Sequence, residues 1–218
     1  MSQADLLDHA DMDYAAARRH MIDSQLRPND VADKTLLAAI QRVAREDYFP
    51  ADRRAVAYRD RAIPLGDGRF APAPTVLFKL IDRAAAKPGE RALVIGPGSD
   101  YAGAVLAELG LEVVALDTEK SDGPAHPGVE TSKGALERGY GADGSADLIL
   151  VTGAIEQLSD ALLAQLKDDG RIAAPMIEGG VSRLGIARKV GGRVSFRSFA
   201  DAQVPRLAAF DVPQGFTF

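Results

Sequence analysis

The chain of 218 residues contains no cysteine, no tryptophan and only three histidines. Without cysteine it can form no disulfide, no thiolate metal site and no cysteine nucleophile. The histidines, His9, His20 and His126, are scattered through polar segments and form no pair with the spacing of metal ligands. We therefore expect no metal site in this protein.

The chain also lacks a long apolar run and a long basic run. No apolar stretch approaches the roughly 20 residues that span a membrane, and the N-terminus is acidic and polar, unlike a signal peptide. The formal net charge of −5 disfavours general nucleic-acid binding. The composition therefore predicts a cytoplasmic globular protein with neither nucleic acid nor a membrane as partner.

A glycine turn that follows a short apolar run organises the rest of the sequence. Residues 92–95 are unbroken, apolar and β-branched toward the end, which is typical of a strand buried on both faces. After the turn at 96–98, residues 101–110 carry apolar side chains at helical spacing. A second apolar run, 112–116, ends in Asp117. This order of strand, turn, helix, strand and acid is typical of the first half of a nucleotide-binding α/β unit.

The residue types in this unit indicate a cofactor pocket. Gly96 and Gly98 can adopt backbone angles that a side chain forbids, and they let a ligand approach the main chain closely. Asp117 is expected at the carboxyl end of the neighbouring strand, where a carboxylate can accept both hydroxyls of a ribose. The alternative is that the glycines serve only the turn and that Asp117 is a solvated acid at a strand end.

The residues after the turn bear on the kind of cofactor. A dinucleotide site has a third glycine where Tyr101 stands, and its helix N-terminus is free for a pyrophosphate. Asp100 stands at that N-terminus and would repel phosphate, although it would also stabilise the helix through the dipole. S-Adenosylmethionine carries a ribose and a cationic sulfonium but no phosphate, so Asp100 is compatible with it and disfavours a nicotinamide cofactor.

Helical patterns fill the first part of the chain, and the sheet is expected to begin after them. Three helices are predicted: one over about 11–26, one capped by Asp30 or Asp33 that carries residues 36–43, and one from Thr75 to about Ala84. We therefore predict an N-terminal helical extension or lid over residues 1–88, followed by a compact α/β domain over residues 89–218.

The second half of the chain predicts the rest of the sheet. Residues 118–128 are rich in proline and glycine, so a regular crossover helix is not expected there. Residues 147–151 form another buried strand, and Ser159 can cap a helix. The alternating segments 182–190 and 193–199 flank a Gly-Gly pair and predict an antiparallel hairpin.

Several stretches together resemble the protein-L-isoaspartate O-methyltransferases, in the divergent form common in alphaproteobacteria. The matching stretches are residues 21–27, 45–50, 57–61, 63–66, 95–99, 151–154 and 162–175. The resemblance implies a Rossmann-like methyltransferase fold of α/β class, with a mostly parallel, doubly wound sheet of seven strands. It also implies methyl transfer from S-adenosylmethionine to the carboxylate of an isoaspartyl residue in a protein or peptide substrate.

The resemblance carries site residues over to this chain. It implies cofactor contacts from Gly96, Gly98, Ser99, Asp100, Asp117, Gly134 and Thr152. On the substrate side, Phe70, Ala71 and Pro72 stand where the family has Thr-Ile-Ser, whose hydroxyls lie near the substrate carboxylate.

Four family positions have lost their usual residue in this chain. The Thr-Ile-Ser hydroxyls are gone, Val94 replaces an acid, Asp100 replaces a glycine, and Ala135 replaces the acid of the pair that meets the adenine. Each lost hydrogen bond to a buried ligand group costs on the order of 1–3 kcal/mol. A non-catalytic binding or regulatory module with a degraded cofactor site is therefore the alternative hypothesis, and a nicotinamide-dependent oxidoreductase is the least favoured one.

The losses do not exclude catalysis, because methyl transfer depends mostly on positioning and on a dry pocket. A carboxylate acceptor is already a nucleophile, so the reaction needs no histidine or cysteine. The sequence accordingly predicts an O-methyltransferase without a designated catalytic side chain.

Overall fold

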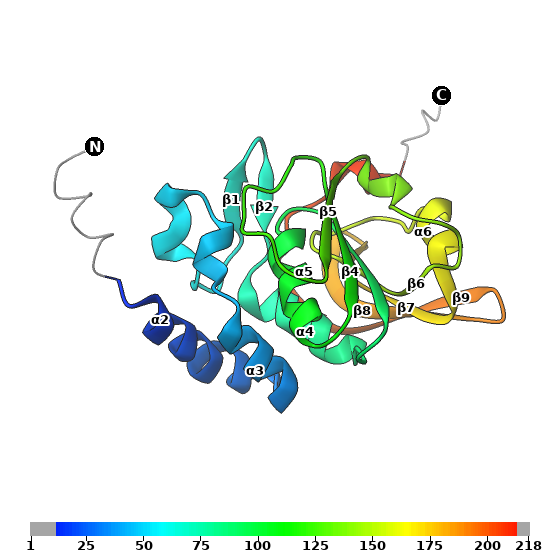
Figure 1. The fold of residues 1–218 in the computed structure, drawn as a ribbon. Helices are drawn as coiled ribbons and strands as arrows, with labels where there is room; N and C mark the ends of the chain where they lie inside the picture. Colours follow the sequence, from blue (N-terminus) through cyan, green and yellow to red (C-terminus); the bar gives the residue numbers. More distant parts are fainter. Residues whose placement is uncertain (1–11, 213–218) are drawn as a thin grey trace, which may run out of the picture.

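The computed structural model describes residues 12–212 of the chain (Figure 1). Two features named in the sequence analysis, His9 and the start of the first helix at position 11, lie outside that range. The helices are α2 (Tyr14–Met21), α3 (Lys34–Arg42), α4 (Pro74–Ala84), α5 (Ser99–Glu108) and α6 (Asp160–Gln165). Short 3₁₀ and π turns lie at Ile22–Leu26, Arg27–Asn29, Arg45–Tyr48, Ala51–Val56, Leu136–Arg138 and Ala208–Phe210.

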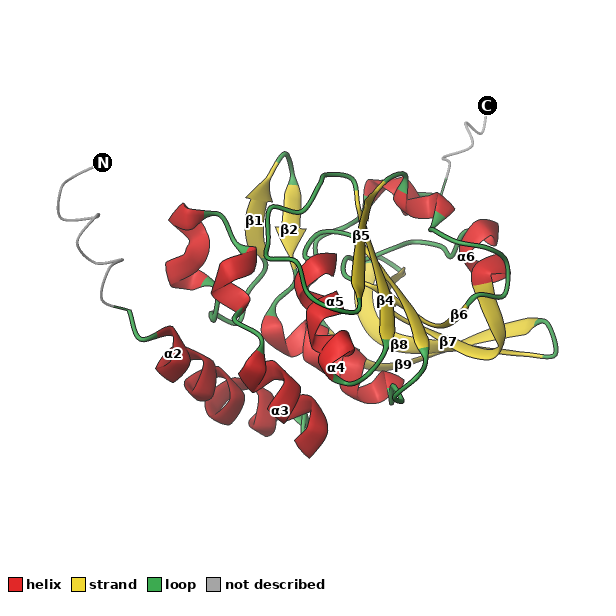
Figure 2. Cartoon of the chain, viewed as in Figure 1, coloured by secondary structure: helices red, strands yellow, loops and turns green. Residues whose placement is uncertain are grey.

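A seven-stranded sheet forms the centre of the molecule, and a separate hairpin of two strands lies beside it (Figure 2). The strands are β1 (Ile63–Gly66), β2 (Arg69–Ala71), β3 (Arg91–Ile95), β4 (Glu112–Asp117), β5 (Val129–Lys133), β6 (Ala146–Val151), β7 (Leu166–Glu178), β8 (Val181–Val190) and β9 (Arg193–Asp201). The order in the large sheet is β5-β4-β3-β6-β7-β8-β9. Strands β3 to β7 are parallel to one another, and β8 and β9 extend the sheet as an antiparallel hairpin.

This strand order is that of a doubly wound sheet, because the chain starts at β3 and builds outward in both directions. The carboxyl ends of β3 and β6 meet where the order reverses, and ligands bind at such a point in open α/β sheets. The predicted strands at 91–95, 112–116 and 147–151 and the predicted hairpin are confirmed. Residues 118–128 contain no helix, as their proline and glycine content predicts.

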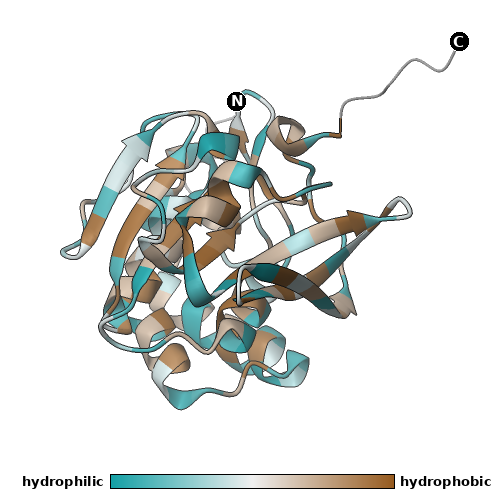
Figure 3. Cartoon of the chain, turned by 90° about the vertical axis from the view of Figure 1, so that its right-hand side faces the viewer, coloured by the Kyte–Doolittle hydropathy of each residue, from teal (hydrophilic) through white to brown (hydrophobic). Residues whose placement is uncertain are grey.

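Both faces of the central strands are covered, which explains why their sequences are uniformly apolar. Helices α4 and α5 pack on one face against Val94, Leu148 and Leu150. Helix α6 and two 3₁₀ turns cover the other face, where Ile95 and Ile149 are buried. In Figure 3 apolar residues are concentrated along the central strands, whereas the projecting β8–β9 hairpin carries a mixture of polar and apolar residues.

The N-terminal helices pack directly on the sheet domain. Asp33 caps α3 by accepting the Leu36 N–H at 2.7 Å, as predicted. One continuous hydrophobic core runs from Met21 in α2 to Leu184 in β8. The hairpin of β1 and β2 was not predicted, because its two strands are short and its glycine-rich turn dominates the local sequence.

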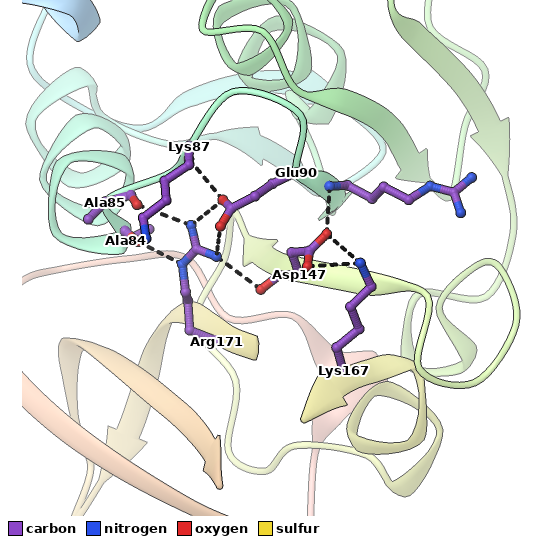
Figure 4. A network of polar contacts seen from close by, with 8 residues as sticks. Ala84, Ala85, Lys87, Glu90, Asp147, Lys167 and Arg171 are labelled. Carbon is purple, nitrogen blue, oxygen red and sulfur yellow. Dashed lines mark hydrogen bonds and ion pairs between the residues drawn. The ribbon is translucent and has the colours of Figure 1, made fainter. Parts of the chain in front are cut away.

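Arg171 in β7 lies at the centre of a polar network at the amino ends of the parallel strands (Figure 4). Its guanidinium donates to both carboxylate oxygens of Glu90 at 2.6 and 3.0 Å, and to the carbonyls of Ala84, Ala85 and Asp147. Burial alone would raise the pKa of Glu90, but hydrogen bonds from Arg171 and the Lys87 N–H lower it below the usual value. The network ties the end of α4 to the sheet.

We predict that Arg171→Met lowers the free energy of unfolding by about 3 kcal/mol, because it leaves Glu90 and three backbone carbonyls without their donor. Urea denaturation of both proteins measures the difference. Arg91→Met is the matched control, since the Arg91–Glu112 pair is exposed and worth less than about 1 kcal/mol. Equal losses in the two variants would contradict the structural role of Arg171.

Candidate cofactor pocket

A pocket of about 240 Å³ lies at the carboxyl ends of β3 and β4. Its walls come from five parts of the chain. They are residues 47–54, the β1–β2 hairpin, the glycine turn with the start of α5, the end of β4 with the loop after it, and residues 131–132 of β5. The lining residues are Asp47, Tyr48, Phe49, Pro50, Ala51, Arg54, Leu65, Arg69, Gly98, Ser99, Asp100, Ala115, Asp117, Glu119, Lys120, Ser121, Asp122, Gly123, Thr131 and Ser132.

The glycine turn has a conformation that only glycine adopts readily. Gly96 has a φ of 108°, and a Cβ there would lie 2.6 Å from the Thr152 Oγ1. Gly98 has a φ of 78° and lies against Ala71 at the end of β2. The turn therefore brings backbone to the floor of the pocket while side chains from β2 and β6 pack around it. Ser99 follows as the buried first residue of α5.

Asp100 connects the start of α5 to the loop that follows β4. One carboxylate oxygen accepts the Tyr101 N–H at 2.8 Å, and the other accepts the Ser121 hydroxyl. Ser121 Oγ also accepts the Gly123 N–H at 3.0 Å. Burial raises the pKa of Asp100, and these hydrogen bonds offset the rise only in part. Asp100 therefore holds the loop over the pocket, a role that the sequence did not indicate.

Asp117 lies at the carboxyl end of β4, as its place in the motif predicts. Its Oδ1 accepts the Thr118 N–H at 2.7 Å, and its Oδ2 accepts an Arg69 guanidinium N–H at 2.8 Å. The Asp117 side chain is 13% exposed and that of Arg69 is 21% exposed. Burial raises the pKa of Asp117, while the Thr118 N–H and the Arg69 charge act against that rise.

Aromatic side chains form the wall opposite Asp117. Tyr48 contacts Tyr101 edge to face, with ring centroids 5.5 Å apart. A Cβ on Gly123 would lie 2.8 Å from the Tyr48 ring, so the loop packs closely on this wall. Beneath it, the Arg45 guanidinium is buried near the rings of Phe49 and Tyr101, and it donates to two backbone carbonyls. This wall excludes water from one side of the pocket.

Sequence reasoning assigned no role to Arg45, Tyr48 or Arg69. Arg45 and Tyr48 lie in the stretch 45–50, which matches the family. That match is the only feature of the sequence that points to them. Arg69 immediately precedes the substituted segment at 70–72, but nothing local indicates that its side chain reaches Asp117. Such a contact spans 48 residues of sequence and follows from the fold alone.

The structure brings four of the seven expected cofactor residues into the pocket lining. Gly98, Ser99, Asp100 and Asp117 line it. The other three support it from behind. Gly96 sets the turn, and the Thr152 hydroxyl is buried and donates to the Ile95 carbonyl at 3.1 Å. The Gly134 N–H donates to the Asp117 carbonyl at 3.0 Å and so fixes the end of β4.

The three substrate-side positions lie beyond the glycine turn. Phe70 is 37% exposed, Ala71 is buried against Gly98, and the Pro72 carbonyl accepts from Arg45. The chain that continues from them enters a second, larger cavity of about 1070 Å³. Its lining includes Ala73, Thr75 and Lys79 of the α4 region, together with parts of the β7–β8 turn and the segment after β9. Residues 70–72 line neither cavity, but Ala71 lies against Gly98 of the first and the next residue, Ala73, lines the second.

Two features that residues 12–212 lack bear on the site. No cluster of three or more histidine, aspartate or glutamate side chains is arranged there to bind a metal ion. No helix in the same range has the length and apolar character needed to cross a membrane. Asp100 and Asp117 are instead held by hydrogen bonds, and Asp117 also by Arg69.

The doubly wound sheet and the pocket at the carboxyl ends of β3 and β4 define a protein of the Rossmann-like methyltransferase class. The family model that describes protein-L-isoaspartate(D-aspartate) O-methyltransferase matches residues 16–204. The chain therefore belongs to the protein-L-isoaspartate O-methyltransferase family, and the resemblance seen in the sequence is confirmed.

Individual relatives agree with this assignment. The chain is 35% identical over 202 residues to a protein-L-isoaspartate O-methyltransferase of Methylorubrum populi, covering 88% of this chain and 95% of that one. It is 33% identical over 205 residues to the protein of the same name from Methylorubrum extorquens, covering 89% of this chain and 90% of that one.

Solved structures confirm the predicted fold class. The chain superposes with a TM-score of 0.72 on a Plasmodium falciparum protein named as a protein-L-isoaspartate O-methyltransferase, in complex with S-adenosyl-L-homocysteine. That match has 17% identity and covers 91% of this chain and all of the other. A second structure, of a protein-L-isoaspartate O-methyltransferase, has a TM-score of 0.71 at 17% identity and covers 89% of this chain and 66% of the other.

We predict that Asp100→Asn raises the free energy of unfolding at pH 7, because burial disfavours the charged form of Asp100 in the folded protein. Because the folded-state pKa of Asp100 lies above the ordinary value of 3.8, its contribution to stability is complete below that value. It is lost as the pH rises through the folded pKa. Asparagine has nearly the same shape as aspartate but carries no charge. The difference in free energy of unfolding between the variant and the wild type should therefore shrink as the pH falls toward 3.8.

Thermal and urea unfolding of both proteins between pH 3.5 and pH 8 measure this difference. Asp122→Asn is the matched control, because Asp122 is an exposed acid of the same loop. Its stability should stay within about 0.5 kcal/mol of the wild type. An Asp100→Asn variant that is less stable than the wild type at pH 7 would show that the charge itself holds the loop.

Proposed function

We propose that this protein transfers a methyl group from S-adenosylmethionine to the carboxylate of an isoaspartyl residue in a protein or peptide. The observation that carries the proposal is the convergence of the Gly98–Asp100 turn and Asp117 on one pocket, in a chain that belongs to this enzyme family. The cytoplasmic location and the lack of a nucleic-acid partner expected from the composition remain predictions.

The residues present fit an adenosyl ligand with a cationic sulfonium. The pocket lining contains five acidic and three basic side chains, so its field favours a positive ligand. Asp117 would hold the ribose, and the turn from Gly96 to Ser99 would lie against the methionine portion. Asp100 and the wall of Tyr48 would exclude water from that portion. When bound, S-adenosylmethionine supplies an electrophilic methyl group.

The reaction needs little from the protein beyond position. A carboxylate has an ordinary pKa of about 3.9, so it is already anionic at neutral pH and needs no general base. One of its oxygens forms the new C–O bond while the methyl carbon leaves sulfur. The products are a methyl ester and S-adenosylhomocysteine, and no proton is transferred. Alignment of the two reactants in a dry site accounts for rate enhancement of this kind.

The acceptor would enter from the larger cavity, on the far side of Phe70, Ala71 and Pro72. Thr75 and Lys79 in its lining are the polar groups nearest to that segment in sequence. The Thr75 hydroxyl donates to Asp60, so Lys79 is the group of the two that would attract a substrate carboxylate. The comparisons give no support to the non-catalytic alternative or to an oxidoreductase.

We predict that the purified protein transfers radiolabelled methyl groups from S-adenosylmethionine to an isoaspartyl peptide. The matched peptide with an ordinary aspartate should accept none above background. Asp117→Asn should lower kcat/KM by about tenfold or more, because it removes one acceptor from the ribose contact. Absence of transfer, together with no heat of binding at millimolar S-adenosylhomocysteine, would reject the enzyme and leave the non-catalytic module.

A further inference from the structure

Arg69 stands in the place that a ribose needs. A bidentate contact to a ribose uses both oxygens of the strand-end carboxylate. In this structure the Thr118 N–H binds Oδ1 of Asp117, and the Arg69 guanidinium binds Oδ2 at 2.8 Å. Both side chains line the same pocket. A carboxylate oxygen that accepts a charge-assisted hydrogen bond is a weaker acceptor for a neutral hydroxyl.

Hydrogen bonds satisfy only some of the donors of the Arg69 guanidinium. Its Nε is buried and finds no partner within residues 12–212, although its Nη1 is paired with Asp117. A buried donor without an acceptor is costly, so this arrangement of the guanidinium is not held by a full set of contacts. Arg69 can therefore leave Asp117 at a lower cost than the fully bonded Arg171 could leave Glu90.

The element that carries Arg69 is a hairpin outside the large sheet, and it joins the main core through Ile63 and Ala71. Strands β1 and β2 form a hairpin of their own, separate from the large sheet, and their register shifts between Pro64 and Gly66. The turn between them runs through Gly66, Asp67 and Gly68, all with positive φ. A two-stranded hairpin of this kind is marginal by itself and moves more easily than the parallel strands.

We propose that the Arg69–Asp117 ion pair is a counter-ion lock on the cofactor site, and that cofactor binding requires Arg69 to give up Asp117. This inference rests on the proposed function, because it assumes that Asp117 receives the adenosyl ribose. Arg69 then sets the cofactor affinity of this chain without contributing a favourable contact to the cofactor. Breaking the pair is part of the cost of binding, so removing Arg69 tightens the complex.

Calorimetric titration with S-adenosylhomocysteine tests the lock. Arg69→Gln should lower the dissociation constant about tenfold, which corresponds to about 1.4 kcal/mol. Lys133→Gln is the matched control. Lys133 lies beside Asp117 in the sheet, and its substitution removes the same positive charge. Lys133 pairs with Glu119 at 2.8 Å, however, and is not part of the pocket lining. Its dissociation constant should change by less than about twofold.

A double-mutant cycle with Asp117→Asn identifies the partner. In the Asp117→Asn background the Arg69→Gln change should no longer tighten binding, because there is no ion pair to release. Thermal melts establish that the variants are folded. If Arg69→Gln does not fold, Arg69→Lys replaces it, since a lysine keeps the charge but loses the planar donor geometry and should tighten binding to a smaller degree.

The outcomes separate this inference from the proposed function. Binding to Arg69→Gln that is tighter than to the wild type, including binding seen only in the variant, supports the lock. Equal or weaker binding in Arg69→Gln, with the wild type binding normally, overturns the lock and leaves the function in place. No binding to either protein overturns both.

Discussion

The contact between Thr152 and Gly96 fixes the point at which the chain leaves the sheet for the cofactor turn. The Thr152 N–H and hydroxyl both bind the Ile95 carbonyl, while the Gly96 N–H binds the Leu116 carbonyl at 2.8 Å. These bonds join the carboxyl ends of β3, β4 and β6. Because a side chain at position 96 would collide with Thr152, the turn, the start of α5 and the position of Asp100 all depend on this glycine.

The amino ends and the carboxyl ends of the parallel strands differ in how fully their polar groups are paired. At the amino ends, Arg171 is surrounded by acceptors and its network is saturated. At the carboxyl ends, Asp100 and Asp117 are partly buried with raised pKa values, and the Arg69 Nε has no hydrogen-bond partner among residues 12–212. Functional sites commonly carry such local costs, which the rest of the fold must offset. The saturated end supplies stability, and the acidic end is available to a ligand.

A Pro/Gly-rich loop follows β4 and closes one side of the pocket. It packs on Tyr48 and is held by Asp100 through Ser121. Asp100, which stands where the resemblance implies a glycine, therefore has a structural role inside this chain as the anchor of that loop.

The sequence alone determined the buried strands, the antiparallel hairpin and the place of Asp117, since each follows from local periodicity or from spacing along the chain. It left the cap of α3 open between Asp30 and Asp33, and the structure shows that Asp33 is the cap. It did not reveal the β1–β2 hairpin. Nor did it show that Arg69 meets Asp117, because ion pairs between distant segments leave no local pattern. Only the tertiary structure decided which groups close the pocket, because it brings together five segments that are separate in sequence.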